Sequence, residues 1–219
     1  MVEIIPAILT DSQVKFKELM LKLEPYAGRI HVDVADGEFV PNKTVTGYEE
    51  IKGIEAAVKF DVHLMVKKPQ DHIKEWLHTY VDRFIVHAES NSPAGGDLVE
   101  IIKIIKDHKR KVGIAINPET DTDGIEKYLK DIDFVQFMTV HPGFQGGEFV
   151  HEVVDKISAF HEEYPGIMIM ADGGITPETA PKLVKAGASV LVCGSYIVKS
   201  QNVEAAIKVL GESIKDISH

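Results

Sequence analysis

The stretch IHVDVADGEFVPN, Ile30 to Asn42, decides the fold because it sets polar side chains inside an apolar, strand-like run. Residues two positions apart point to the same face of a strand, so His31 and Asp33 share a face. Burying an imidazole and a carboxylate without compensation is costly. The stretch therefore indicates a strand whose end delivers these side chains to a site that compensates their charge.

The rest of the chain repeats this pattern, with short apolar runs alternating with longer amphipathic ones. We expect eight strands, at residues 3–9, 29–34, 59–65, 83–87, 111–116, 134–138, 167–171 and 189–193. We expect helices at residues 12–26, 69–80, 98–111, 149–164, 176–187 and 203–217. Eight βα repeats in this length predict an α/β fold, a (β/α)8 TIM barrel, with a doubly wound open sheet as the competitor. Because no linker interrupts the series, we expect a single domain over residues 1–219.

Composition and charge narrow the class of protein. The 219 residues are 44% hydrophobic and 26% charged, an ordinary globular balance that can bury one large core. A formal net charge of −10 argues against nucleic acid as a partner. The single cysteine, Cys193, excludes a disulfide framework, and we expect it to be a buried, inert thiol. Because the chain also shows no signal peptide and no membrane-spanning run, we expect a cytoplasmic protein with no membrane partner.

Charged and polar residues gather at the ends of three expected strands. The segment FDVHLMV places Asp61, His63 and Met65 on one strand face, and ADGG ends the seventh strand with Asp172. Active sites of such barrels are built at the carboxyl ends of the strands. A divalent cation would compensate the four polar groups, which are His31, Asp33, His63 and Asp172. This ligand set suits Zn²⁺, Fe²⁺, Mn²⁺ or Co²⁺, whereas any one of the residues alone would more often be a hydrogen-bonded loop residue.

Three glycine clusters follow the late strands. They are MTVHPGFQGGEF at 138–149, the GG pair at 173–174 and CGS at 193–195. Glycine lets the backbone point several N–H groups at one anion, and loops after the late strands are the usual phosphate position in these barrels. Each cluster alone is compatible with an ordinary turn. Together they predict a phosphate site that needs no lysine or arginine, in agreement with an acidic protein.

The segments HVDVADGEFVPN, DVHLMV, NPET, PGFQGGEF, ADGGI and VCGS resemble the signature segments of the ribulose-phosphate 3-epimerase family. The resemblance runs in order from PAIL near the start to GSYI near the end. It implies a TIM barrel of the ribulose-phosphate-binding type that interconverts D-ribulose 5-phosphate and D-xylulose 5-phosphate in the pentose phosphate pathway. It also implies one divalent metal ion per site, with Zn²⁺ favoured and Fe²⁺, Mn²⁺ or Co²⁺ as alternatives. The expected partners are a sugar phosphate and further copies of the chain in a homo-oligomer.

Carried over position by position, the resemblance assigns residues to roles. The metal ligands would be His31, Asp33, His63 and Asp172. Asp33 and Asp172, from opposite sides of the barrel mouth, would also be the acid and base that exchange the C3 proton through an enediolate. The substrate and phosphate contacts would be Ala7, Met65, Met138, Gly143, Phe144, Gln145, Gly146, Gly147, Gly173, Gly174, Gly194 and Ser195.

Three residues depart from the family pattern. Ala7 stands where the family usually has serine, Ala35 where a methionine packs over the reacting carbons, and His141 where asparagine or aspartate is common. Ala7 lacks the serine's hydrogen bond and Ala35 predicts a wider pocket, so a D-allulose 6-phosphate 3-epimerase is the nearest alternative. A low-activity paralogue that senses a sugar phosphate is an alternative of another class.

Other residues receive more modest interpretations. A decarboxylase of a related barrel superfamily would need Asp-x-Lys-x-x-Asp at the third strand, and DVHLMV supplies no lysine there. His87 and Glu89 in VHAES end the fourth strand, where bordering the site is one alternative, and we interpret them instead as a hydrogen-bonded loop pair. We interpret Asp36 as a residue that shapes the turn after its strand.

Overall fold

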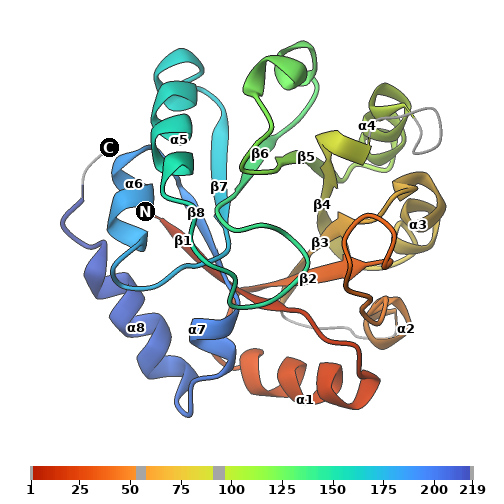
Figure 1. Ribbon diagram of the computed structural model, residues 1–219. Helices are drawn as coiled ribbons and strands as arrows, with labels where there is room; N and C mark the ends of the chain where they lie inside the picture. The colour runs from red at the N-terminus through yellow and green to blue at the C-terminus, as the bar shows by residue number, and fades with distance from the viewer. Residues whose placement is uncertain (1, 53–57, 91–96, 218–219) are drawn as a thin grey trace.

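Eight parallel strands pair in sequence order, and β1 pairs with β8 to close a barrel (Figure 1). The computed structural model describes residues 2–52, 58–90 and 97–217. The strands are β1 (Glu3–Ile8), β2 (Arg29–Ala35), β3 (Lys59–Met65), β4 (Val81–His87), β5 (Lys111–Ile116), β6 (Phe134–Met138), β7 (Met168–Asp172) and β8 (Val190–Cys193). The TIM barrel predicted from the βα repeats is confirmed, and closure excludes the open sheet.

Helices surround the barrel on its outer side (Figure 1). They are α1 (Gln13–Leu23), α2 (Tyr48–Ile51), α3 (Pro69–Trp76), α4 (Leu98–Asp107), α5 (Glu152–Glu163), α6 (Ala180–Lys185), α7 (Ser195–Val198) and α8 (Val203–Ser213), with 3₁₀ turns η1 (Ala88–Ser90) and η2 (Thr122–Tyr128). The six expected helices are present but shorter than their patterns, while α2, α7 and the 3₁₀ turns were not expected. The start of α1 has a local cause: the Ser12 side chain accepts a hydrogen bond from the Lys15 N–H and caps the helix there.

The barrel interior contains an apolar layer and an ionic layer. Ile85, Phe134 and Met170 belong to a buried cluster that is separate from the larger core between strands and helices. Asp61 is fully buried and forms ion pairs with Arg29 and Arg83. Asp61 therefore shares a strand face with His63, as the sequence predicted, but its charge is compensated by arginines rather than at the strand end.

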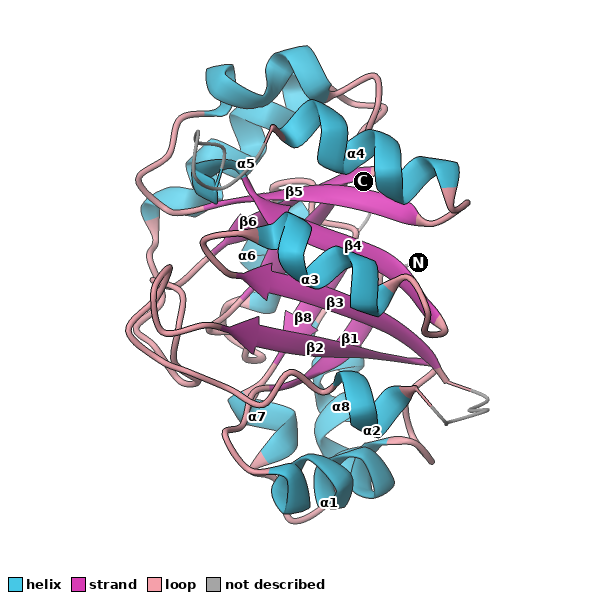
Figure 2. Ribbon diagram, turned by 90° about the vertical axis from the view of Figure 1, so that its right-hand side faces the viewer, coloured by secondary structure: helices cyan, strands magenta, loops and turns pink. Residues whose placement is uncertain are grey.

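The carboxyl ends of the strands meet on one side of the molecule, where long loops gather (Figure 2). The segment between β6 and α5 curves across the centre of the barrel (Figure 1). The Asp36 carboxylate accepts hydrogen bonds from the backbone N–H groups of Glu38, Phe39 and Lys67, which confirms its predicted role in the turn. In the described part of the chain, no helix is both long and apolar enough to cross a membrane.

Candidate active site

The four predicted metal ligands converge inside the barrel mouth. Strand register sets Asp33 beside His63, and Asp172 is the last residue of β7. One side-chain donor atom from each of the four residues lies within 4.8 Å of the other three, and all four residues are buried. The residues come from β2, β3 and β7, so the cluster exists only because the barrel closes.

Hydrogen bonds within the cluster set its charges. The His63 Nδ1 atom lies 2.9 Å from Asp33 Oδ1 and 3.4 Å from Asp172 Oδ2. Burial disfavours a charged His63, but the hydrogen bonds with Asp172 and Asp33 outweigh burial and raise the pKa of His63 to about 9. Burial likewise disfavours a charged Asp33, yet the neighbouring imidazoles of His31 and His63 hold its pKa well below the usual range. The cluster is therefore arranged to keep a carboxylate ionised beside a positive charge.

The donor set fits a divalent cation. The Nε2 atom of His31 is buried and has no hydrogen-bond partner among the residues that the structure describes. This nitrogen faces Asp33 Oδ1 at 3.4 Å and Asp172 Oδ2 at 3.7 Å. An unpartnered buried nitrogen is costly in a dry interior, and a cation between two imidazole nitrogens and two carboxylates would satisfy it. The chemistry of these residues thus agrees with the metal expected from the sequence.

Two further side chains, Gln136 and His87, touch the cluster. The sequence reasoning left out Gln136 and treated His87 only as one half of a loop pair. Gln136, fully buried on β6, donates from Nε2 to Asp172 Oδ2 at 2.8 Å. His87 and Glu89 form the predicted pair at 3.1 Å, but His87 Nε2 also lies 2.8 Å from His63 Nε2. The signal for Gln136 was a polar letter in the otherwise apolar strand FVQFM. Its contact with Asp172 follows from the register of the neighbouring strands β6 and β7, in which Met138 pairs with Asp172.

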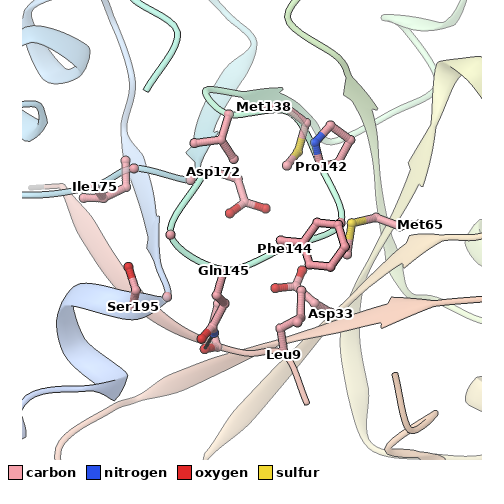
Figure 3. A pocket seen from close by; sticks show the side chains of 17 residues that line it. Leu9, Asp33, Met65, Met138, Pro142, Phe144, Gln145, Asp172, Ile175 and Ser195 are labelled. Carbon is pink, nitrogen blue, oxygen red and sulfur yellow. Dashed lines mark hydrogen bonds between the residues drawn. The ribbon is translucent and has the colours of Figure 1, made fainter. Parts of the chain in front are cut away.

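A pocket lies over the cluster, and the carboxylates of Asp33 and Asp172 both line it (Figure 3). The other predicted contacts that line it are Ala7, Met65, Met138, Gly143, Phe144, Gln145, Gly146, Gly173, Gly174, Gly194 and Ser195. Gly147 is not among the lining residues, and a Cβ at that position would instead contact Val140 at 3.3 Å. Among the residues that the structure describes, no lysine or arginine lines this pocket.

Close packing of the loops explains two of the glycines. Gly173 has φ +106°, and a Cβ there would lie 2.4 Å from Val140 Cγ2. A Cβ at Gly194 would lie 3.2 Å from Gln145 Nε2, so the loops after β6 and β8 meet at that point. These glycines allow three loops to approach one another around the pocket.

The residues that depart from the family pattern lie in different surroundings. Ala7 lines the pocket, and its carbonyl oxygen accepts a hydrogen bond from Gln145 Nε2 at 3.3 Å. The Ala35 side chain is not in the lining and packs in an apolar cluster with Val40 and Met65. His141 is exposed, with Nδ1 2.8 Å from Glu119 Oε1. Ala35 therefore borders the pocket indirectly, through the lining residues Met65 and Leu9 of its cluster, which weakens the prediction that it widens the pocket.

Comparison with known proteins identifies the family. The model of the ribulose-phosphate 3 epimerase family matches residues 3–198. The chain belongs to this family. The ribulose-phosphate 3-epimerase of Bacillus subtilis is 35% identical over 215 residues, covering 94% of this chain and 97% of that protein. The chloroplastic ribulose-5-phosphate-3-epimerase of Arabidopsis thaliana is 36% identical over 211 residues, covering 93% of this chain and 74% of that protein. Membership in the epimerase family confirms the resemblance and the prediction of an isomerase.

More distant solved structures share the fold alone. KGPDC from Streptococcus mutans superposes with a TM-score of 0.72 at 11% identity, covering 98% of this chain and 97% of that one. Orotidine 5'-monophosphate decarboxylase from Sulfolobus solfataricus gives a TM-score of 0.69 at 14% identity, covering 99% of each chain. At this level of identity the likeness extends to the barrel fold of this chain and no further.

Proposed function

We propose that this protein is a metal-dependent epimerase that inverts C3 of D-ribulose 5-phosphate to give D-xylulose 5-phosphate. The observation that carries the proposal is the pair of carboxylates, Asp33 and Asp172, which face one pocket beside two buried imidazoles. The relatives named as ribulose-phosphate 3-epimerases give the substrate class. Inversion requires a proton to leave one face of C3 and another to arrive at the opposite face, which two carboxylates from different strands can provide.

Each aspartate takes one proton-transfer role in this proposal. We assign Asp33, which lies beside both imidazoles, as the carboxylate that is ionised at the start and accepts the C3 proton. Asp172, which accepts a hydrogen bond from Gln136, would deliver a proton to the other face. The roles exchange in the reverse reaction, because both aspartates end each turnover with the opposite protonation state.

The metal would be held by His31, Asp33, His63 and Asp172, and we propose Zn²⁺, with Fe²⁺, Mn²⁺ or Co²⁺ as alternatives. When bound, such a cation supplies Lewis acidity that stabilises negative charge on a neighbouring substrate oxygen. The chain's own residues keep this region dry, since both histidines are fully buried. Exclusion of water strengthens the electrostatic interactions that stabilise an enediolate.

The loops after β6, β7 and β8 would hold the phosphate. Gln145 and Ser195 offer polar side chains to the same part of the pocket, next to the glycines of all three loops (Figure 3). With no cationic side chain in the lining, backbone N–H groups would supply most of the hydrogen bonds to the phosphate. Met65 and Met138 would cover the carbon chain of the sugar.

The pentose is preferred over the hexose because only one of the two alanine departures lies in the pocket lining. Ala7 lines the pocket, whereas the Ala35 methyl group packs against Val40 and Met65. Turnover measured side by side on D-ribulose 5-phosphate and D-allulose 6-phosphate would decide between the two substrates. A higher kcat/KM for allulose 6-phosphate would overturn the pentose assignment and retain the epimerase chemistry.

Proton exchange tests the mechanism directly. In D₂O the metal-loaded protein should exchange the C3 proton of D-ribulose 5-phosphate, and a chelator should stop the exchange. Asp33→Asn and Asp172→Asn should each remove turnover while leaving the circular dichroism spectrum unchanged. Binding of the sugar phosphate without any exchange would instead favour the sensor alternative.

Four features of the setting remain predictions from the sequence. We propose that the protein acts in the pentose phosphate pathway, in the cytoplasm, as a homo-oligomer of a single-domain chain over residues 1–219. The closed barrel over most of the described residues supports the single domain. Light scattering on the purified protein would measure the oligomeric state.

A further inference from the structure

A line of hydrogen bonds leads away from the metal cluster through the end of β4. His63 Nε2 lies 2.8 Å from His87 Nε2, and His87 Nδ1 lies 3.1 Å from Glu89 Oε2. The two imidazole rings are nearly parallel, with centroids 4.9 Å apart and an interplanar angle of 20°. His63 and His87 are both fully buried, so no solvent competes for these nitrogens.

His63 at one end of this line and Glu89 at the other require the same ring nitrogen of His87 to carry its proton. The His63 atom that faces the carboxylates is Nδ1. If Nδ1 gives its lone pair to the cation, the His63 proton lies on Nε2, and His87 Nε2 must accept it. At the other end, hydrogen bonds with His87 and Thr120 outweigh burial and hold the pKa of Glu89 at about 2, so this ionised carboxylate can only accept a proton from His87 Nδ1. Both ends therefore require His87 to carry its proton on Nδ1.

Glu89 is itself held in place. Its Oε1 atom accepts hydrogen bonds from the Asn117 backbone N–H and from the Thr120 hydroxyl. These partners lie between β5 and η2, so two neighbouring loops keep the carboxylate pointed at His87. His31, the other imidazole of the cluster, has no partner for Nδ1 among the described residues. The hydrogen-bonded support is thus specific to His63.

From this geometry we infer that His87, oriented by Glu89, is a positioning residue that sets the tautomer of His63 so that its Nδ1 lone pair points at the metal. The inference rests on the metal site of the proposed function. Outer hydrogen bonds of this kind orient a ligand and raise its basicity, and their loss typically weakens metal affinity about 10- to 100-fold.

Two substitutions at one position separate this role from packing. His87→Phe keeps an aromatic ring against Phe39 and His63 but removes the nitrogen that accepts from His63. His87→Gln loses the ring but can accept through its amide oxygen. We expect Zn²⁺ affinity, measured by competition with a fluorescent chelator, to fall about 10- to 100-fold in His87→Phe and only a few-fold in His87→Gln. If His87 served only to fill space, the glutamine variant would be the weaker one, and that result would overturn the inference.

Nitrogen NMR of the wild-type protein gives a readout that does not depend on any variant folding. In the Zn²⁺-loaded protein labelled with ¹⁵N-histidine, we expect the proton of His63 on Nε2, that of His87 on Nδ1, and a coupling between the two facing Nε2 atoms. A proton on Nε2 of His87 would refute the inference. Failure of the wild type to bind Zn²⁺, Fe²⁺, Mn²⁺ or Co²⁺ at all would instead refute the proposed metal site, so the two failures are distinguishable.

Discussion

Metal binding should depend steeply on pH, because the cation must displace a proton from His63. In the metal-free cluster, Asp33 and Asp172 raise the pKa of His63 to about 9 against the opposing effect of burial. The metal ligand is the neutral imidazole, so binding at neutral pH releases this proton. The perturbation to apply is therefore a change of pH on the metal-free protein, followed by titration with a metal.

The expected magnitude follows from the raised pKa. With a pKa of about 9, the neutral fraction of His63 rises from about 1% at pH 7 to about 10% at pH 8, so affinity should rise about tenfold over that unit. An imidazole with the ordinary pKa of about 6.5 is already mostly neutral at pH 7 and would give less than about a twofold rise. The two cases differ enough for a direct measurement.

Calorimetric titration with Co²⁺ in buffers of different ionisation enthalpy measures both affinity and the number of protons released. We expect about one proton per Co²⁺ at pH 7 from His63. His78→Gln, a change at an exposed histidine, is the matched control and should keep both values. An affinity that is flat between pH 7 and pH 8, with no proton released, would show that the carboxylates do not hold His63 protonated and would refute this reasoning.

Three further predictions address stability. Gly173→Ala should lower the free energy of unfolding in urea by about 2 kcal/mol or more, because Gly173 has a positive φ and an added Cβ would clash with Val140. The same change should raise KM for the sugar phosphate. The control, Gly166→Ala, has open space around it and should change the stability by less than about 0.5 kcal/mol. Asp61→Asn should lower the free energy of unfolding by about 3–5 kcal/mol, because two buried guanidinium groups lose the buried carboxylate between them and keep only the more exposed Glu3 as a shared partner. Asp82, a partly exposed partner of Arg29, provides the comparison, and Asp82→Asn should cost less than about 1 kcal/mol. Equal losses in the two variants would contradict the ionic-layer argument. The third prediction concerns the metal-free protein in the presence of a chelator. There the raised pKa of His63 contributes stability that is fully present below about pH 6.5 and is lost as pH rises towards 9. The urea midpoint of the wild type should therefore fall over that pH range, and that of His63→Asn should fall less.

The sequence predicted the strands well because their signal is local. Apolar runs with period-two alternation identified all eight, and three of them, β3, β5 and β6, have the predicted bounds. Helix lengths were less accurate, since amphipathic patterns continue into turns where caps and loop contacts end the helix. The expected helix at residues 176–187 is confined to Ala180–Lys185, because Thr176 and Thr179 form a hydrogen-bonded turn before it.

The local character of this signal also explains which site residues could be predicted from the sequence. His31 and Asp33 stand two residues apart on one strand, so their shared face could be read directly from the alternation. Their convergence with His63 and Asp172 followed from the rule that parallel strands of a barrel end on one side. The sequence by itself thus determined the fold class, the donor set and the glycine loops.

Only the tertiary structure decided how these groups act on one another. The register of neighbouring strands set His87 against His63, placed Gln136 beside Asp172 and paired Asp61 with arginines. Closure also determined that Ala7 faces the pocket while Ala35 packs beside Val40. The physical reason is that hydrogen bonds and ion pairs require residues far apart in the chain to meet to within a few tenths of an ångström, and periodicity along a single strand carries no information about such distances.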